Sequence, residues 1–238
     1  MILVGLSVGI SIVAPLYIFF REKMGNRASQ KSNLSRRRVF KLTIINLTLN
    51  ILVGSVLMAM FLNILSNISS LNSYQIVLAL LLFMSAGATF YGNGIYITSI
   101  ILEAYTLPQV QRIREYRTQF IATHLFHGPI SHVLIYSGWP IAMFFLSLLE
   151  LGGSDVNYPV LILSIGGMAT AIAYSFGQIY NHTYQFQMLT NTILGIALLI
   201  FFGSGGPIYT YSLIFTITSA IVLWCYFIKQ SIFSQSSI

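Results

Sequence analysis

The chain has 238 residues, of which 56% are hydrophobic and only 7% are charged, whereas a soluble domain has about 25% charged residues. Its mean hydropathy is +0.79, which predicts a multi-pass protein of the cell membrane and excludes an enzyme built on a folded cytosolic core. The net charge of +7 favours contact with the lipid bilayer and its anionic headgroups over nucleic-acid binding, which needs a basic domain outside the membrane.

Long apolar runs recur along the whole chain, and a membrane-spanning helix needs roughly 20 apolar residues. The runs cover residues 2–20, 42–62, 76–102, 120–149, 159–180, 188–202 and 208–228. The first run has no basic residue before it, so we expect a retained helix there and not a signal peptide. We therefore predict an all-α fold in which residues 1–238 form a single transmembrane domain, a bundle of seven helices.

The basic residues test the predicted number of membrane crossings, because seven crossings from an outside N-terminus place all 12 of them on one side of the membrane. They are Arg21, Lys23, Arg27, Lys31, Arg36, Arg37, Arg38, Lys41, Arg112, Arg114, Arg117 and Lys229. The opposite loops hold only the acids Glu150 and Asp155. The positive-inside rule then predicts an outside N-terminus, a cytoplasmic C-terminus and a solvated loop over residues 21–41.

Charged residues are nearly absent from the predicted spans, and their absence argues against several functions. The last run has no lysine that could form a retinal Schiff base, because Lys229 lies at its edge. Ion-coupled carriers usually place charged side chains at mid-membrane, whereas Glu103 lies at the inner end of the third run. We expect no independent catalytic activity and assign no catalytic residue.

Histidines are the ionisable side chains that remain within the fourth run. On a regular helix, His124 and His127 share one face, while His132 lies about 80° from His124 in the opposite rotational sense. Gly128-Pro129 is expected either to kink this helix or to make Pro129 the first residue of the true span.

Two further residues are expected at the same depth, since Glu103 ends the third run and His182 follows the fifth. With His124 and His127 they form a candidate site for a divalent metal such as Zn, Fe or Cu. His124, His127, His132 and His182 are also candidate axial ligands of a haem b. The alternatives are hydrogen-bonded interfacial residues, which the aromatic belt would accommodate, and a proton path.

A second feature is Gly92-Asn93-Gly94 in the third run. Two glycines around an asparagine indicate either close helix packing or an unwound backbone that binds a ligand.

The fourth run carries His127 and His132 before the sequence Ile135-Tyr136-Ser137-Gly138-Trp139. Later in the chain, Gln185-Phe186-Gln187 precedes Gly195. This pattern resembles the seven-span cytochrome oxidase assembly factors and related archaeal membrane proteins of unknown function, although the His-Met motif usual in those families is missing. The resemblance implies a place in the respiratory chain.

Three hypotheses follow for the function. The first is a subunit or assembly factor of a respiratory or oxidase complex, with other membrane subunits as partners and haem or a metal bound by the histidines. The second is a structural subunit without a cofactor. The third is a carrier or channel for a small neutral solute that depends on the Gly92-Asn93-Gly94 segment.

Overall fold

The structure is a computed structural model that describes residues 2–30, 36–67, 72–110, 116–151, 158–200 and 205–235. Within these ranges all regular elements are helices and no strand occurs. They are α1 (Ile2–Gln30), α2 (Arg36–Ser66), α3 (Ser73–Val110), α4 (Tyr116–Leu125), the π-helical turn η1 (Phe126–Ile130), α5 (Ser131–Glu150), α6 (Val160–Tyr180), α7 (Tyr184–Ile200) and α8 (Pro207–Gln235). Because α4, η1 and α5 follow one another without a break, the described residues form seven continuous helices. The all-α prediction is confirmed.

Five segments of these helices are long and apolar enough to cross a membrane. They are Thr43–Ser66, Ser73–Glu103, Tyr116–Glu150, Val160–Tyr180 and Pro207–Ile232. Two further apolar helices, Val4–Phe20 and Tyr184–Ile200, are shorter. The described residues of all seven predicted runs lie on helices, apart from Pro159, which precedes α6, and the five long segments are consistent with a multi-pass membrane protein.

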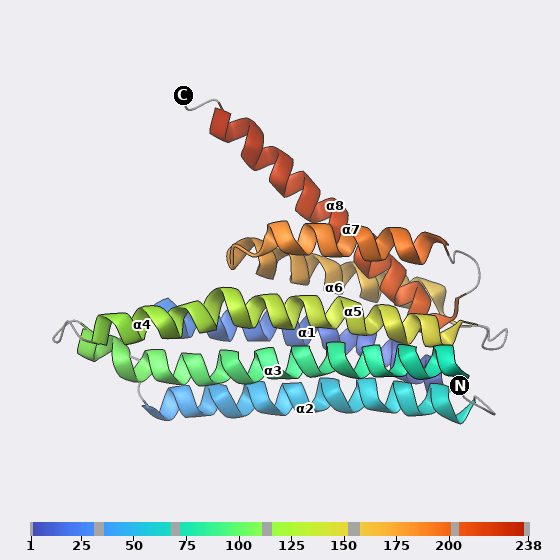
Figure 1. The fold of residues 1–238 in the computed structure, drawn as a ribbon, viewed down its shortest axis with the longest axis horizontal. Coiled ribbons are helices and arrows are strands. Elements are labelled where there is room, and N and C mark those ends of the chain that lie inside the picture. The colour runs from blue at the N-terminus through green and yellow to red at the C-terminus, as the bar shows by residue number, and fades with distance from the viewer. Residues whose placement is uncertain are drawn as a thin grey trace.

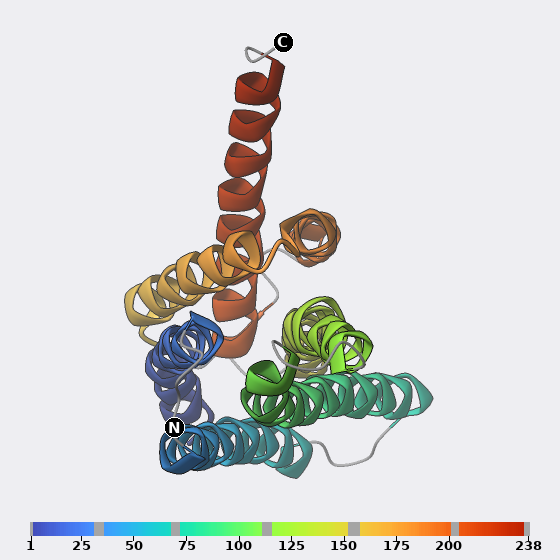
Figure 2. The same ribbon diagram turned by 90° about the vertical axis from the view of Figure 1, so that its left-hand side faces the viewer.

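The helices lie side by side in a bundle from which only the last one departs. α3 packs along α5, and α1 contacts both α2 and α6. α8 contacts α6 and α7, and its C-terminal end projects beyond the other helices (Figures 1 and 2). The last turns of α3 and the start of α4 lie at the left of Figure 1, and the end of α6 and the start of α7 point towards the same side. We call this the α3–α4 end.

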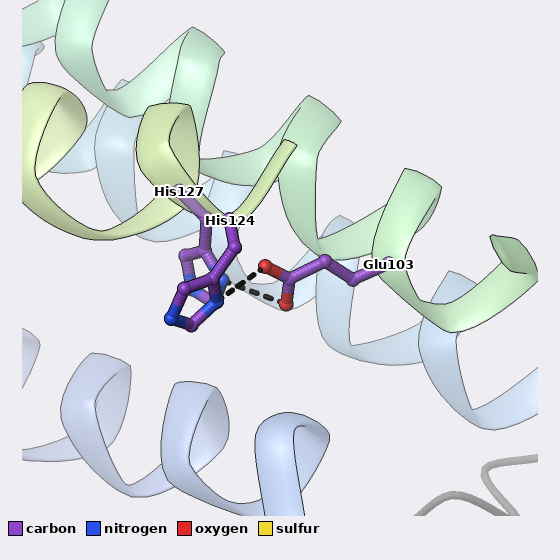
Figure 3. A group of neighbouring side chains, drawn as sticks. All are labelled: Glu103, His124 and His127. Atoms are coloured by element: carbon purple, nitrogen blue, oxygen red, sulfur yellow. Dashed lines mark hydrogen bonds and ion pairs between the residues drawn. The ribbon is translucent and has the colours of Figure 1, made fainter. Parts of the chain in front are cut away.

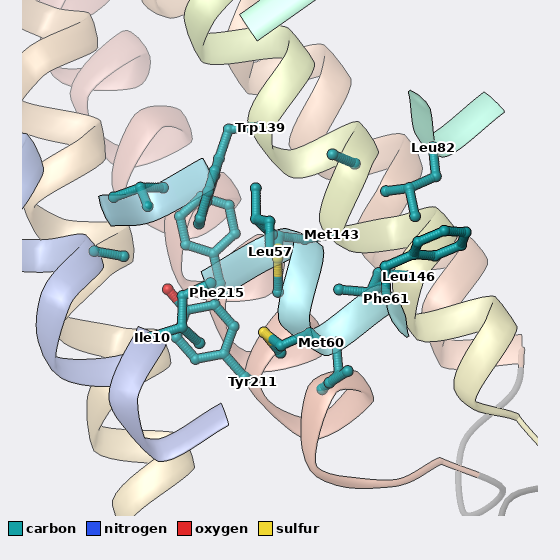
Figure 4. Packing of buried hydrophobic residues seen from close by; sticks show 14 of the residues in the cluster. Ile10, Leu57, Met60, Phe61, Leu82, Trp139, Met143, Leu146, Tyr211 and Phe215 are labelled. Carbon is teal, nitrogen blue, oxygen red and sulfur yellow. The ribbon is translucent and has the colours of Figure 1, made fainter. Parts of the chain in front are cut away.

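Large apolar side chains fill the space where α1, α2, α5 and α8 meet (Figure 4). Ile10, Met60, Leu146 and Phe215, one from each of these helices, are at most 1% exposed. The outer surface is also apolar, and there Leu161, for example, is 73% exposed. Such a continuous apolar surface is unfavourable in water and suited to contact with lipid.

Glycines allow α3 and α5 to approach backbone to backbone. A Cβ atom added at Gly138 of α5 would lie 2.7 Å from the Ser85 carbonyl oxygen and 2.9 Å from the Thr89 nitrogen. A Cβ atom added at Gly92 would lie 2.9 Å from the Ile135 nitrogen, whereas one at Gly94 would meet no atom within 4 Å. α3 remains helical through this segment, so of the two interpretations the unwound backbone is not observed, and close packing accounts for Gly92.

The connection predicted over residues 21–41 is shorter than expected, because α1 continues to Gln30 and α2 begins at Arg36. Apolar periodicity ends near residue 20, but a helix can extend beyond its apolar segment, and the run therefore underestimates its length. Lys31, Arg112, Arg114 and Asp155 lie outside the described residues.

Glu150 does not lie in a solvated loop as predicted. It is the last residue of α5 and is 6% exposed. Its two carboxyl oxygens accept hydrogen bonds from the Ile208 nitrogen at 3.2 Å and the Tyr209 nitrogen at 2.9 Å. The first N–H groups of a helix have no partner within the helix, so Glu150 caps the start of α8.

Candidate metal centre

The two neighbouring helices α3 and α4–α5 bring Glu103, His124 and His127 together at the α3–α4 end (Figure 3). His124 Nδ1 lies 3.1 Å from Glu103 Oε1, and His127 Nδ1 lies 2.8 Å from Glu103 Oε2. Each carboxylate oxygen therefore faces one imidazole. The two histidines thus share a face, as their spacing predicts, and Glu103 lies beside them.

The three side chains differ in exposure. The His127 side chain is 9% exposed and that of Glu103 is 12% exposed, whereas 62% of the His124 side chain is exposed. The group is thus enclosed on the side of the bundle and open at His124. A small ion could reach the carboxylate from that open side without unfolding a helix.

The π-helical turn η1 explains how the helix continues past Gly128-Pro129. Proline has no N–H group and its ring clashes with the preceding turn of a regular helix, whereas a π turn adds a residue to the turn. The Ser131 hydroxyl donates a hydrogen bond to the His127 carbonyl oxygen. The helix begins at Tyr116 and continues through Pro129, so Pro129 is not its first residue, and His127 lies within the π turn.

His132 lies deeper in the bundle and is not part of the ligand group. Its ring is 6.0 Å from that of His127, 5.4 Å from that of Tyr96 and 5.6 Å from that of Tyr136, measured between centroids. It is 3% exposed. The structure therefore places His132 against aromatic side chains, and the metal group of the described residues does not include it.

His182 lies in the turn between α6 and α7, where it is exposed and has a positive φ of 57°. The predicted depth is consistent with this position, since the α6–α7 turn is also at the α3–α4 end. However, His182 is not among the described residues whose ligand atoms converge on Glu103. Sequence gives depth along a helix but not the lateral position of each helix in the bundle.

The ligand atoms of Glu103, His124 and His127 all lie within 4.8 Å of one another. Carboxylate and imidazole are common ligands of Zn²⁺ and related ions, and two ligands bound about 2.0–2.1 Å from a tetrahedral ion are about 3.3 Å apart. The distances of 2.8 and 3.1 Å join the two imidazoles to different carboxylate oxygens, so binding of one ion requires the ligand atoms, which lie within 4.8 Å of one another, to move closer together. Without a metal, the same atoms form hydrogen bonds that join α3 to α4 and η1.

A polar network around Tyr174 has no counterpart in the sequence predictions. The fully buried Tyr174 hydroxyl lies 2.8 Å from the Tyr136 carbonyl oxygen and 2.7 Å from Gln187 Oε1, and it accepts a hydrogen bond from Asn191 Nδ2 at 3.2 Å. Gln187 Nε2 in turn donates to Ser137 Oγ at 2.9 Å. The available signal was the presence of Gln187 and Asn191 in an apolar run, because such side chains are costly against lipid.

The geometry of the three ligands is the basis for inferring a function, since neither a protein-family model, nor a curated protein, nor a solved structure matches this chain.

Proposed function

We propose that this protein is a multi-pass membrane protein that binds one divalent transition-metal ion, of the Zn²⁺ class, through Glu103, His124 and His127. The observation that carries the proposal is the convergence of three ligand atoms within 4.8 Å. α3 supplies the carboxylate and the next helix supplies both imidazoles, so the site depends on the packing of the bundle.

The arrangement favours a bare ion over a haem. In a b-type haem with two histidines, the imidazoles approach the iron from opposite faces of the porphyrin. His124 and His127 belong to one helix, and both Nδ1 atoms face the same carboxylate. A porphyrin does not fit between two rings held in this way.

Three protein ligands leave a fourth tetrahedral position open, whereas structural zinc sites are closed by four. The exposed His124 supports reversible binding, because the ion can enter and leave on that side. We therefore place the function in the binding and transfer of a metal ion.

The proposal includes the topology of the chain. All seven helices cross the membrane, with the N-terminus outside and the C-terminus in the cytoplasm, as the distribution of the 12 basic residues favours. α7 (Tyr184–Ile200) has 17 residues and is about 26 Å long. This is less than the hydrocarbon thickness of about 30 Å, and local thinning of the bilayer accommodates the difference. The α3–α4 end then faces the cytoplasm, and the ion exchanges with that compartment.

Equilibrium dialysis of the purified protein against Zn²⁺ and Co²⁺, followed by elemental analysis, tests the proposal. We expect one ion per chain, and Co²⁺ should give the visible absorption of a tetrahedral site. Replacing Glu103 by Gln, or His127 by Ala, should weaken binding by more than about tenfold, since even changes outside the ligand set cost about 10–100-fold. His124→Ala should do the same with the least effect on folding, because this side chain is the most exposed of the three.

His182→Ala is the matched control, because His182 is an exposed histidine at the same end of the bundle but outside the ligand group. It should bind the ion as tightly as the wild type. Equal binding by the wild type and by a protein with all three ligand substitutions would contradict the proposal, as would a loss of binding in the His182 variant alone.

A further inference from the structure

Tyr17, Asn50 and Asn93 form a polar group between α1, α2 and α3. The Tyr17 hydroxyl lies 2.5 Å from Asn50 Oδ1 and 3.1 Å from Asn93 Oδ1. Asn50 is 9% exposed and Asn93 is 4% exposed. The hydroxyl has a single proton and can donate to only one of the two amides, so at least one amide keeps N–H groups that have no hydrogen bond among the described residues. The two amide nitrogens are not among the fully buried, unpartnered side-chain atoms of the described residues, and both asparagines line an open groove. N–H groups that face hydrocarbon are costly, so the group suits a ligand that accepts hydrogen bonds.

A groove between α2 and α3 leads to these amides. It has a volume of about 660 Å³, and its walls are formed by apolar side chains together with Ser55, Asn50 and Asn93. From Leu47 to Leu62 it follows α2 for about 22 Å. Among the residues that the structure describes, no charged side chain lines the groove, so an elongated, neutral and largely apolar molecule is complementary to it.

An inner cavity of about 40 Å³ lies beside the groove, and Asn50, Phe90 and Asn93 line both spaces. The other walls of the cavity are mainly apolar and include the rings of Tyr17, Tyr136, Trp139 and Tyr174. The Phe90 ring packs on bare backbone, since a Cβ atom added at Gly54 would lie 2.8 Å from its Cζ. Phe90 lies between the two spaces. The inner cavity is too small for an aromatic ring, so a planar ring fits only in the groove, beside Phe90.

The depth of the amides restricts the ligand further. Asn93 is ten residues before Glu103 on α3, which places it about 15 Å along the helix. This distance is about half of the 30 Å thickness of the hydrocarbon core. A charged or zwitterionic headgroup is costly at that depth, and a phospholipid headgroup remains at the interface.

We infer that this groove binds a membrane quinone, a neutral ring with two carbonyl oxygens and an apolar tail. The carbonyl oxygens accept hydrogen bonds from the amide nitrogens of Asn50 and Asn93, the ring lies beside Phe90, and the tail follows α2 towards Leu62. The inference concerns binding alone, with no redox step. It does not depend on the metal ion, because it uses none of the metal ligands.

The two tryptophans of the chain allow a direct test with decylubiquinone, a quencher of tryptophan fluorescence. Trp139 lines the inner cavity, whereas Trp224 lies on α8 and is 40% exposed. In the Trp224→Phe protein, decylubiquinone should quench Trp139 with a saturating curve. In the Trp139→Phe protein, Trp224 should be quenched only by decylubiquinone dissolved in the lipid, so its quenching should rise linearly with the decylubiquinone concentration.

Asn50→Leu and Asn93→Leu should each weaken saturable binding by about fivefold, the effect of one lost hydrogen bond. Asn46→Leu is the matched control, because Asn46 is a buried asparagine on the same helix that lines neither space. Gly54→Leu should block the groove while both amides remain, which keeps the test valid if the asparagine variants fold poorly.

Three results would overturn the inference. Quenching of Trp139 that does not saturate would show that no site exists. Unchanged binding in both asparagine variants and in the Gly54 variant would show that the quinone site lies elsewhere. Equal displacement of decylubiquinone by decanol or by dioleoylglycerol would show that the groove accepts any neutral lipid and does not recognise a quinone ring.

Discussion

Replacing Glu150 by Gln perturbs the start of α8 without changing the size of the side chain. Glu150 accepts hydrogen bonds from two buried backbone nitrogens, those of Ile208 and Tyr209. The amide of Gln keeps one oxygen acceptor and turns an NH₂ group towards the second nitrogen, so one backbone N–H loses its partner. An unsatisfied buried donor costs about 1–3 kcal/mol, which corresponds to an opening equilibrium about 5- to 150-fold more favourable.

Hydrogen exchange followed by mass spectrometry measures this opening in peptides that cover the start of α8. Exchange at Ile208 and Tyr209 should accelerate in Glu150→Gln and accelerate further in Glu150→Ala, which loses both acceptors. Tyr158→Phe is the control, because it removes the half-buried contact of its hydroxyl with Thr210 Oγ1 at 2.9 Å and leaves the cap intact. Wild-type exchange rates in both Glu150 variants would refute the capping role.

Three further predictions concern packing, the buried network and the metal. Gly138→Ala should lower the free energy of unfolding by about 1–3 kcal/mol, because its methyl group meets the backbone of α3; Gly87→Ala, which meets no atom within 4 Å, should not be destabilising in the same unfolding titration. Tyr174→Phe should cost about 1–3 kcal/mol, because it removes the hydroxyl between Gln187 and Asn191, whereas Tyr180→Phe at an exposed position should be neutral. Metal affinity should fall as the pH falls, because protons compete with the ion for the imidazole nitrogens; calorimetry in buffers of different ionisation enthalpy should detect proton release on binding, and binding without proton release would argue against histidine ligands.

Length and composition were sufficient to predict the fold class and the approximate position of every helix. Roughly 20 apolar residues in a row leave few alternatives in a membrane, since each backbone group must find its hydrogen bond within its own helix. The same signal could not give the helix ends. α1 extends beyond its apolar run to Gln30, because helical hydrogen bonding does not require an apolar side chain.

Helical spacing also predicted the pairing of His124 with His127, which depends only on geometry within one turn. The depth of Glu103, at the end of the preceding helix, was also predicted, but its place beside the two imidazoles depends on how α3 packs against α4 and η1. His132 and His182 could not be sorted in the same way, because their positions depend on the π turn in η1 and on the lateral packing of α6. Neither is encoded by spacing along a single helix.

Other contacts required the packed structure. The cap from Glu150 to α8 joins positions that are 58 and 59 residues apart, and the contact between Tyr17 and Asn93 spans 76 residues. Each of these polar side chains has an ordinary explanation when considered alone in the sequence. The link to respiratory or oxidase complexes stays a prediction, because it rests on the resemblance and no feature of the metal group depends on it.

X-ray absorption at the zinc edge of the Zn²⁺-loaded protein tests the central claim most directly. We predict a first shell of nitrogen and oxygen atoms at about 2.0–2.1 Å, with the scattering pattern of two imidazoles, reduced to one in His127→Ala and unchanged in His182→Ala. Bound zinc with sulfur ligands, or with the same two imidazoles in His127→Ala, would contradict the assignment of Glu103, His124 and His127 as the metal site.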